Sequence, residues 1–373
     1  SYRASGVTVV DYDVDGDYDF VLPSFTGRPQ VMRNLGSDRA FLPGGPKELA
    51  IDDPNADTYL SKFMDFADVT GDGLPDLVVV GNNTVTNRGS IYYYKNNGPR
   101  QAPVFTPTAQ PVYTSPQAGT PIGPLDLVDL DGDGKLELVF WNQGAGKLFW
   151  APIPKDPRAG EWQRYVVFEG AGEGLAKADI DGDGREEILA GGRWFDYEKG
   201  RWTHALIDPA QSHPRIVAAD FDGDRRVEVV MVPGDANGRL MLYRFQEDPR
   251  RSENWHGEDL LKTEVIHGHT LEVADFNRDG RPDLFCAEMR RWTAGDDNPQ
   301  ARAWVLLNNG SGGFTPVEVL RGHDWHEGRV TDMDGDGYPD LVCKPYNWQT
   351  PRLDIWLMSN QPTEASRRKA SFR

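Results

Sequence analysis

Residues 126–141 of the chain are DLVDLDGDGKLELVFW. Acidic side chains occupy positions 1, 3, 5 and 9 of a nine-residue segment that begins at Asp129, and an apolar run lies on each side of it. Calcium takes six to eight oxygen ligands at about 2.3–2.6 Å, and oxygens at alternate positions of a tight loop can converge on one ion. A single such segment fits either a calcium loop or a solvated acidic turn.

The same frame occurs seven times, with successive starts 41 to 61 residues apart. Position 6 is glycine in six copies and Arg225 in the fifth, where a calcium site should be weakest. The second and sixth copies replace one carboxylate by Thr70 or Asn277 and should bind less tightly than the first. Seven copies in one frame favour calcium loops over acidic turns. The expected metal ligands are Asp11, Asp13, Asp15, Asp19, Asp68, Thr70, Asp72, Asp76, Asp129, Asp131, Asp133, Glu137, Asp179, Asp181, Asp183, Glu187, Asp220, Asp222, Asp224, Glu228, Asp275, Asn277, Asp279, Asp283, Asp332, Asp334, Asp336 and Asp340.

The flanks of the loops predict β-strands. Runs such as VTVV before the first copy and LVVV after the second are short, apolar and rich in β-branched residues. An EF-hand loop differs, since its last ligand is at position 12 and helices flank it. Each repeat should therefore consist of a strand, a calcium loop and a second strand.

These repeats resemble the calcium-loop β-propellers, namely the integrin α-subunit head and proteins with FG-GAP or VCBS repeats. The resemblance covers essentially the whole chain and implies an all-β, seven-bladed propeller with four-stranded antiparallel blades. The calcium loops would join the first and second strands, and residues 1–373 would form one domain with a polar tail at 361–373. The sequence lacks the Phe-Gly and Gly-Ala-Pro signature of integrins and their inserted domain. The last blade would take its outer strand from the tail near Ala370–Phe372 or, less favoured, from Tyr2–Ala4.

The charge of the chain indicates a calcium requirement. The formal net charge is −18, and 28 of the 58 Asp and Glu residues lie in the seven loops. Up to seven Ca²⁺ ions would bring this charge to about −4, whereas without them the carboxylates repel one another. Because weak calcium sites suit the millimolar calcium outside cells, we expect an extracellular or periplasmic protein.

Several other properties follow from the composition. No apolar run reaches 18 residues, so no membrane insertion is expected. The beginning, SYRASGVTVV, has no signal-peptide pattern and would fit a mature secreted form. The sequence has no basic stripe, so nucleic acid is not an expected partner. We also expect a monomer. Cys286 and Cys343 occupy equivalent positions of neighbouring repeats and should be buried free thiols.

Propeller topology predicts a second site at the blade end opposite the loops. Segments about six residues before each loop, or six after it, collect aromatic and basic side chains. Aromatic rings stack on sugars, and arginine and lysine pair with carboxylates. The expected catalytic residues are His269, His326 and Tyr346; the expected substrate-binding residues are Tyr59, Lys62, Arg193, Trp194, His213, Arg215, Arg290, Trp292, Lys344 and Trp348.

Each of these residues has a structural alternative. Trp194 and Trp292 could wedge between blades, His269 could be a hydrogen-bonded strand start, and Arg290 could lie in a solvated loop. His269 and His326 stand at the same register of adjacent repeats, so they could act as acid and base or hold an additional metal.

Three functions remain open. The first is binding of a saccharide, most plausibly acidic, in a central pocket. The second is a polysaccharide lyase or sugar dehydratase that uses the same pocket. "SHPRIVAADFDGD" and "HGHTLEVADFN" distantly resemble the propeller of fungal aldos-2-ulose dehydratases, and several polysaccharide lyases are seven-bladed. The third is an integrin-like adhesion or protein-interaction module. G-x-S-x-G, H-E-x-x-H, C-x-x-C and Walker A motifs are absent from the sequence.

Overall fold

The computed structural model describes residues 6–24, 28–36, 44–56, 59–108, 110–211, 213–290, 298–345 and 353–358; for Tyr59 and Leu60 it describes the backbone only. Antiparallel β-strands make up the regular structure of this part, together with the short 3₁₀ turns η2 (Gln143–Ala145) and η3 (Ser252–Asn254). No helix among the described residues has the length and apolar character needed to span a bilayer.

The chain forms two compact units. The N-terminal unit comprises Thr8–Arg33 and Gly45–Ser212, and the C-terminal unit comprises Ser1–Val7, Asn34–Gly44 and His213–Arg373.

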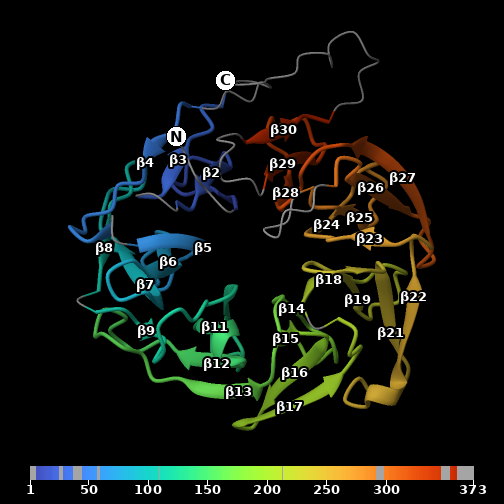
Figure 1. Ribbon diagram of the computed structural model, residues 1–373, viewed down its shortest axis with the longest axis horizontal. Coiled ribbons are helices and arrows are strands. Elements are labelled where there is room, and N and C mark those ends of the chain that lie inside the picture. The colour runs from blue at the N-terminus through green and yellow to red at the C-terminus, as the bar shows by residue number, and fades with distance from the viewer. Residues whose placement is uncertain are drawn as a thin grey trace. The chain divides into compact units, whose positions relative to one another are not determined.

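The N-terminal unit contains blades 1 to 4, in which strands pair in chain order except that β9 pairs with β7 (Figure 1). Blade 1 is β1 (Thr8–Val10), β2 (Asp19–Leu22), β3 (Gln30–Met32) and β4 (Lys47–Glu48); blade 2 is β5 (Tyr59–Ala67), β6 (Asp76–Asn83), β7 (Arg88–Asn96), β8 (Phe105–Pro107) and β9 (Tyr113–Thr114); blade 3 is β10 (Leu125–Val128), β11 (Glu137–Asn142), β12 (Lys147–Pro152) and β13 (Tyr165–Glu169); blade 4 is β14 (Ala176–Ala178), β15 (Glu187–Ala190), β16 (Arg193–Glu198) and β17 (Arg201–Leu206).

The C-terminal unit contains blades 5 to 7 and a two-stranded ribbon of β20 with β23. Blade 5 is β18 (Pro214–Ala219), β19 (Glu228–Pro233), β21 (Met241–Phe245) and β22 (Trp255–Asp259); the ribbon is β20 (Asn237–Gly238) and β23 (Val265–Ile266); blade 6 is β24 (Thr270–Ala274), β25 (Asp283–Ala287), β26 (Arg302–Asn308) and β27 (Phe314–Arg321); blade 7 is β28 (Glu327–Thr331), β29 (Asp340–Lys344) and β30 (Asp354–Trp356).

Burial explains the apolar run within the second strand of each blade. All residues of β11 and β25 are buried, because neighbouring blades cover both faces of the sheet. The register is regular, with Leu125 opposite Phe140 and Leu138 opposite Ala151 in blade 3. Successive side chains of a strand point to opposite faces of the sheet. One half of the apolar side chains therefore packs against the preceding blade, and the other half packs against the following blade.

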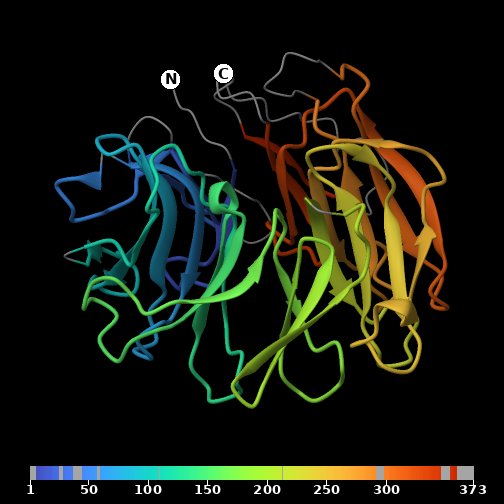
Figure 2. The same ribbon diagram turned by 60° about the horizontal axis from the view of Figure 1, so that its bottom comes forward.

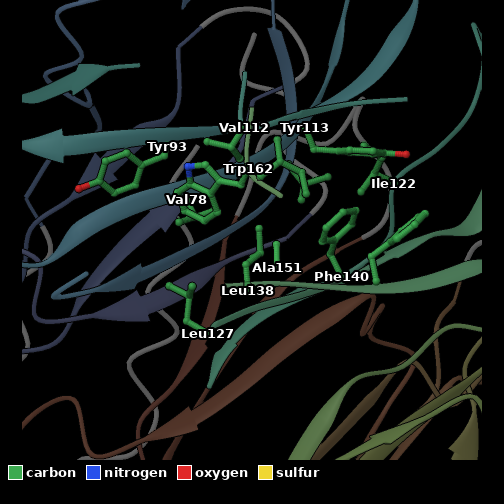
Figure 3. Close-up of a cluster of buried hydrophobic side chains, with 13 residues drawn as sticks. Val78, Tyr93, Val112, Tyr113, Ile122, Leu127, Leu138, Phe140, Ala151 and Trp162 are labelled. Carbon is green, nitrogen blue, oxygen red and sulfur yellow. The ribbon is translucent and has the colours of Figure 1, made fainter. Parts of the chain in front are cut away.

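Blades 2 and 3 pack through a cluster of buried aromatic and aliphatic side chains (Figure 3). Tyr113 lies 4.9 Å from Phe140 between ring centroids, and Tyr93 lies 5.9 Å from Trp162. Aromatic pairs at such distances stabilise a core beyond their area burial, by about 0.5–1.5 kcal/mol each.

The two cysteines lie in the corresponding clusters of the C-terminal unit. Cys286 packs between blades 5 and 6, and Cys343 packs between blades 6 and 7. Both thiols are fully buried and unpaired, which confirms the prediction of two buried free cysteines. Figure 2 shows the sheets that carry them, in orange and red, from a second direction.

Seven successive antiparallel sheets with one connection pattern are the blade repeat of a β-propeller, and the predicted fold class is confirmed. Blade 7 has three strands among the described residues. Both predicted sources of its fourth strand, Tyr2–Ala4 and Ala370–Phe372, lie outside the described residues, as does the tail at 361–373. The single domain over 1–373 stays a prediction.

Burial of both thiols predicts slow chemistry with a thiol reagent. Burial also raises the pKa of Cys286 and Cys343, so little thiolate forms at neutral pH. Ellman's reagent should modify neither cysteine in the folded protein and both in concentrated guanidinium chloride. Rapid modification of the native protein would contradict this packing.

Candidate functional site

Each acidic loop connects the first strand of a blade to its second strand, as the sequence predicted. In blade 1 the loop begins after Val10, the last residue of β1, and ends at Asp19, the first residue of β2. Position 9 begins the second strand in every blade, so the sheet itself fixes this carboxylate. These residues are Asp19, Asp76, Glu137, Glu187, Glu228, Asp283 and Asp340.

One hydrogen bond recurs in all seven loops. The backbone N–H at position 6 donates to the carboxylate at position 1, for example from Gly16 to Asp11 at 3.0 Å. The other six loops make the same bond at 2.8–3.1 Å. The position-1 carboxylate therefore closes the loop on itself, and a carboxylate that accepts this bond still has lone pairs for other partners.

Two positions of each loop require a left-handed backbone. Position 6 has φ between 72° and 100°, a region that glycine enters without steric cost. Position 4 has positive φ as well, at Gly71, Gly132, Gly182, Gly223 and Gly335 but also at Val14 and Arg278. The sequence analysis identified position 6 and missed position 4, although glycine there in five of seven copies was a visible signal.

The position-9 carboxylates are buried at the inner end of the loops. In the third loop Glu137 accepts the N–H of Leu130 at 2.9 Å, and four later loops make the equivalent bond. Burial, followed by repulsion from neighbouring carboxylates, raises the pKa of Glu137 to about 7 and that of Glu187 to about 8. The same causes raise the pKa of Glu228 and Asp340 to about 7. Such groups are costly to ionise unless a cation compensates them.

Acidic oxygen atoms lie close together in the first, third, fourth and fifth loops. In the fourth loop Asp179, Asp181, Asp183 and Glu187 each offer an oxygen within 4.8 Å of the others. Similar groups occur in the first, third and fifth loops. Asp13 Oδ1 and Asp332 Oδ1 are buried and accept no hydrogen bond. Hard oxygen donors in this number and spacing fit Ca²⁺.

Basic side chains lie against the outer carboxylates of several loops. Arg33 pairs with Asp13 and with Asp15, and Lys95 Nζ lies 2.5 Å from Asp72. The pKa of Asp72 is accordingly held below its usual value, chiefly by its hydrogen bond with Lys95. The pairs offset part of the repulsion among the carboxylates of these loops.

A second cluster lies in the C-terminal unit, at the ends of the first strands that are remote from the acidic loops. Arg215 belongs to β18, His269 directly precedes β24, and His326 directly precedes β28. Figure 1 shows β18, β24 and β28 as the consecutive first strands of blades 5 to 7. The two imidazoles are 5% and 9% exposed and stack with ring centroids 4.3 Å apart. The structure thus brings together three of the residues predicted from the sequence.

Hydrogen bonds define the tautomer of His269. Nδ1 lies 2.5 Å from the backbone oxygen of His326, and a carbonyl oxygen can only accept, so Nδ1 carries the proton. The guanidinium of Arg215 contacts the ring, with Nη2 2.6 Å from Nε2 and 2.8 Å from Nδ1. Since Nδ1 carries the proton, Nε2 is the ring nitrogen that can accept.

Carboxylates complete this cluster. Glu327 Oε1 lies 3.6 Å from His269 Nδ1 and 3.5 Å from Arg215 Nη2, and Asp235 Oδ1 lies 3.5 Å from His269 Nε2. Arg329 also lies near Glu327, at 3.8 Å. Asp235 belongs to the segments that the sequence placed at this blade end, whereas Glu327 was not among them although it directly follows His326.

The other predicted residues have different surroundings. Trp194 is fully buried, which favours the wedge between blades over a stacking wall. Lys344 is 1% exposed and donates to the backbone oxygen of Pro345 at 2.8 Å. The guanidinium of Arg193 lies 4.8 Å from the ring centroid of Phe168, and Arg290 donates to Gly322 O at 3.2 Å.

Lys62 is half-buried in the N-terminal unit, where burial lowers the pKa of its amine. His213 precedes β18, and its backbone oxygen accepts the N–H of Gly234 at 3.0 Å. Tyr346, Trp292 and Trp348 lie outside the described residues, and the side chain of Tyr59 is likewise not described.

Comparison with protein families agrees with these repeats. The chain matches the family described as FG-GAP-like repeat over residues 68–140, 129–190, 220–286 and 275–343, which is more than half of its length. Each match spans at least one acidic loop and the second strand that follows it.

Curated relatives and solved structures resemble this chain at low sequence identity. Cartilage acidic protein 1 of Mus musculus is 24% identical over 383 residues, which are 90% of this chain and 56% of that protein. Integrin alpha-V of Gallus gallus is 23% identical over 252 residues, which are 63% of this chain and 23% of the integrin. The crystal structure of BBS1N in complex with ARL6DN, soaked with mercury, has a TM-score of 0.50 and 14% identity, covers 95% of this chain and 91% of that chain, and shows the fold alone. This chain spans about half the length of cartilage acidic protein 1.

The fifth loop offers a direct test of the backbone analysis. Arg225 has φ 72° where six loops have glycine, and a side chain in this region costs about 1 kcal/mol. Arg225→Gly should therefore raise the free energy of unfolding in urea by up to about that amount, even in chelator. Arg226→Gly is the control; φ of Arg226 is not positive, so it should lower stability. Equal losses in both variants would contradict the assignment of strain.

Proposed function

The chain belongs to the FG-GAP-like repeat family, and from that premise we propose an extracellular propeller with two kinds of site. Its acidic loops bind Ca²⁺, and its Arg215–His269–His326 cluster binds an acidic saccharide. The observation that carries the ligand proposal is the convergence of one guanidinium and two stacked imidazoles at the strand ends opposite the loops.

Calcium would be held by the carboxylates at positions 1, 3, 5 and 9, with Thr70 and Asn277 as the neutral substitutes. The bound ion supplies positive charge to carboxylates that are otherwise buried and mutually repulsive. The hydrogen bond from position 6 to position 1 preforms each loop, so little backbone rearrangement accompanies binding.

An extracellular location follows from the calcium proposal. Open, partly exposed loops of this kind suit the millimolar calcium found outside cells. The name of the cartilage acidic protein relatives is in keeping with this location.

Chelation should destabilise the protein in a pH-dependent manner. With calcium removed, Glu137, Glu187 and Glu228 have folded-state pKa values of about 7 to 8, above an unfolded value of about 4.5. The folded apo protein then binds more protons than the unfolded chain between these values, so its stability falls as pH rises from about 4.5 to 8. In EDTA the melting temperature should drop as pH is raised from 5.5 to 8. With saturating calcium the carboxylates stay ionised, and this drop should disappear. An EDTA melting curve that matches the calcium curve at pH 8 would contradict the proposal.

The histidine cluster suits a saccharide because it offers donors and acceptors together. Arg215 donates, His269 Nε2 accepts, and the carboxylates of Glu327 and Asp235 accept from hydroxyl groups. The guanidinium is partly exposed, with its side chain 16% accessible, and can form a bidentate pair with a ligand carboxylate. A uronate-containing saccharide matches both features.

Lyase chemistry is a second candidate, supported by the lone pair of His269 Nε2 beside Arg215. In such an elimination Arg215 would neutralise the uronate carboxylate, and Nε2 would take the proton from C5. The C5–H electrons would form the C4=C5 double bond as the C4–O bond breaks, and the leaving oxygen would take a proton. The product absorbs in the ultraviolet.

Matched sugars distinguish these functions. Calorimetry in calcium buffer should show tighter binding of an oligogalacturonate than of the neutral oligogalactose. Arg215→Gln should remove that preference, while Arg239→Gln, at a half-exposed arginine paired with Asp259, should not. Growth of ultraviolet absorbance that His269→Ala abolishes would identify a lyase. If neither sugar binds, the saccharide proposal fails and a protein-interaction module becomes the better account.

A further inference from the structure

The same cluster contains the donor set of a second kind of metal site. We propose that His269, His326 and Glu327 bind a transition-metal ion of the zinc type, with Asp235 as the fourth ligand. This site is separate from the acidic loops in position and in chemistry, and it does not depend on saccharide binding.

The first argument is the convergence of the donor atoms. His269, His326 and Glu327 each present a ligand atom within 4.8 Å of the other two, and all three residues are buried. With bonds of about 2.0–2.1 Å, the donor atoms of a tetrahedral zinc site lie about 3.4 Å apart. Asp235 Oδ1 lies 3.5 Å from His269 Nε2, which makes Asp235 the candidate for the fourth ligand.

The orientation of His269 is the second argument. Its Nδ1–H donates to the backbone oxygen of His326 at 2.5 Å, which leaves a lone pair on Nε2, 3.5 Å from Asp235 Oδ1. Metal-binding histidines commonly donate their other ring nitrogen to a carbonyl or carboxylate, because this fixes the tautomer and raises the basicity of the ligand.

The third argument is ligand type. Two imidazoles and a carboxylate favour zinc, cobalt or iron, whereas Ca²⁺ prefers oxygen ligands alone. The seven loops contain no histidine at all. Saturating calcium should therefore fill the loops and leave the histidine cluster available.

Arg215 is the competitor for this site. Its Nη2 lies 2.6 Å from His269 Nε2 and 3.5 Å from Glu327 Oε1, where it supplies the positive charge that an ion would supply. An ion bound to Nε2 must displace the guanidinium. Loss of the arginine should therefore strengthen metal binding, whereas a role confined to packing predicts no such gain.

Cobalt titration tests the proposal. The 373-residue chain, saturated with calcium and free of sugar, should bind one equivalent of Co²⁺ with visible d–d absorption, and Zn²⁺ should displace it. His269→Ala and His326→Ala should weaken binding more than tenfold, while His256→Ala, at an exposed histidine of β22, should not. Arg215→Gln should tighten binding several-fold.

Two further measurements keep the test decisive. If an alanine variant melts well below the parent protein, Glu327→Gln, which keeps the shape of the side chain, serves in its place and should also weaken binding more than tenfold. Binding that survives both histidine changes, or that Arg215→Gln weakens, would overturn the proposal. Because the titration contains no sugar, its failure is distinguishable from a failure of saccharide binding.

Discussion

Repulsion among carboxylates in seven tight loops is the constraint on which the rest of the structure depends. Each loop gathers three to five acidic side chains, and the residue at position 9 is fixed in place because it begins a buried strand. The hydrogen bond from the position-6 amide to the position-1 carboxylate draws the loop closed and so concentrates the charge further. A folded state of this kind needs cations, which is why arginine and lysine side chains cover some outer carboxylates and why a divalent ion suits the inner ones.

The loops also determine where chemistry can occur at the other end of each blade. Because a loop always joins the first strand to the second, the residues that enter every first strand lie at the opposite strand end. In blades 5 to 7 these entering residues include His269 and His326, and Arg215 is the second residue of its strand. The acidic loops are thus alike from blade to blade, whereas the residues at the opposite strand ends differ. The repeated scaffold can therefore carry a site that occurs once among the described residues.

The sequence was sufficient for the repeat, the loop positions and the strands around them. Carboxylates at fixed spacing and apolar runs on both sides are local patterns, and local patterns survive folding. The pairing of His269 with His326 was predictable for the same reason, since the two residues occupy one register of adjacent repeats. Burial of Cys286 and Cys343 followed from their positions within the second strands.

Contacts between blades were less predictable. Trp194 and Lys344 looked like ligand-binding groups, but both are buried, and no local pattern of the sequence predicts which residues of a strand are covered. The closeness of Asp235 and Glu327 to His269 depends on three blades at once. The left-handed backbone at Val14 and Arg278 could not be predicted from the sequence, because neither valine nor arginine favours this conformation. The central claim is that the acidic loops bind Ca²⁺, and anomalous diffraction from crystals grown in calcium tests it most directly. The account predicts one peak in each of the seven loops, about 2.3–2.6 Å from the carboxylate oxygens and weakest in the fifth. Loops without peaks, with their carboxylates held by arginine and lysine alone, would contradict it.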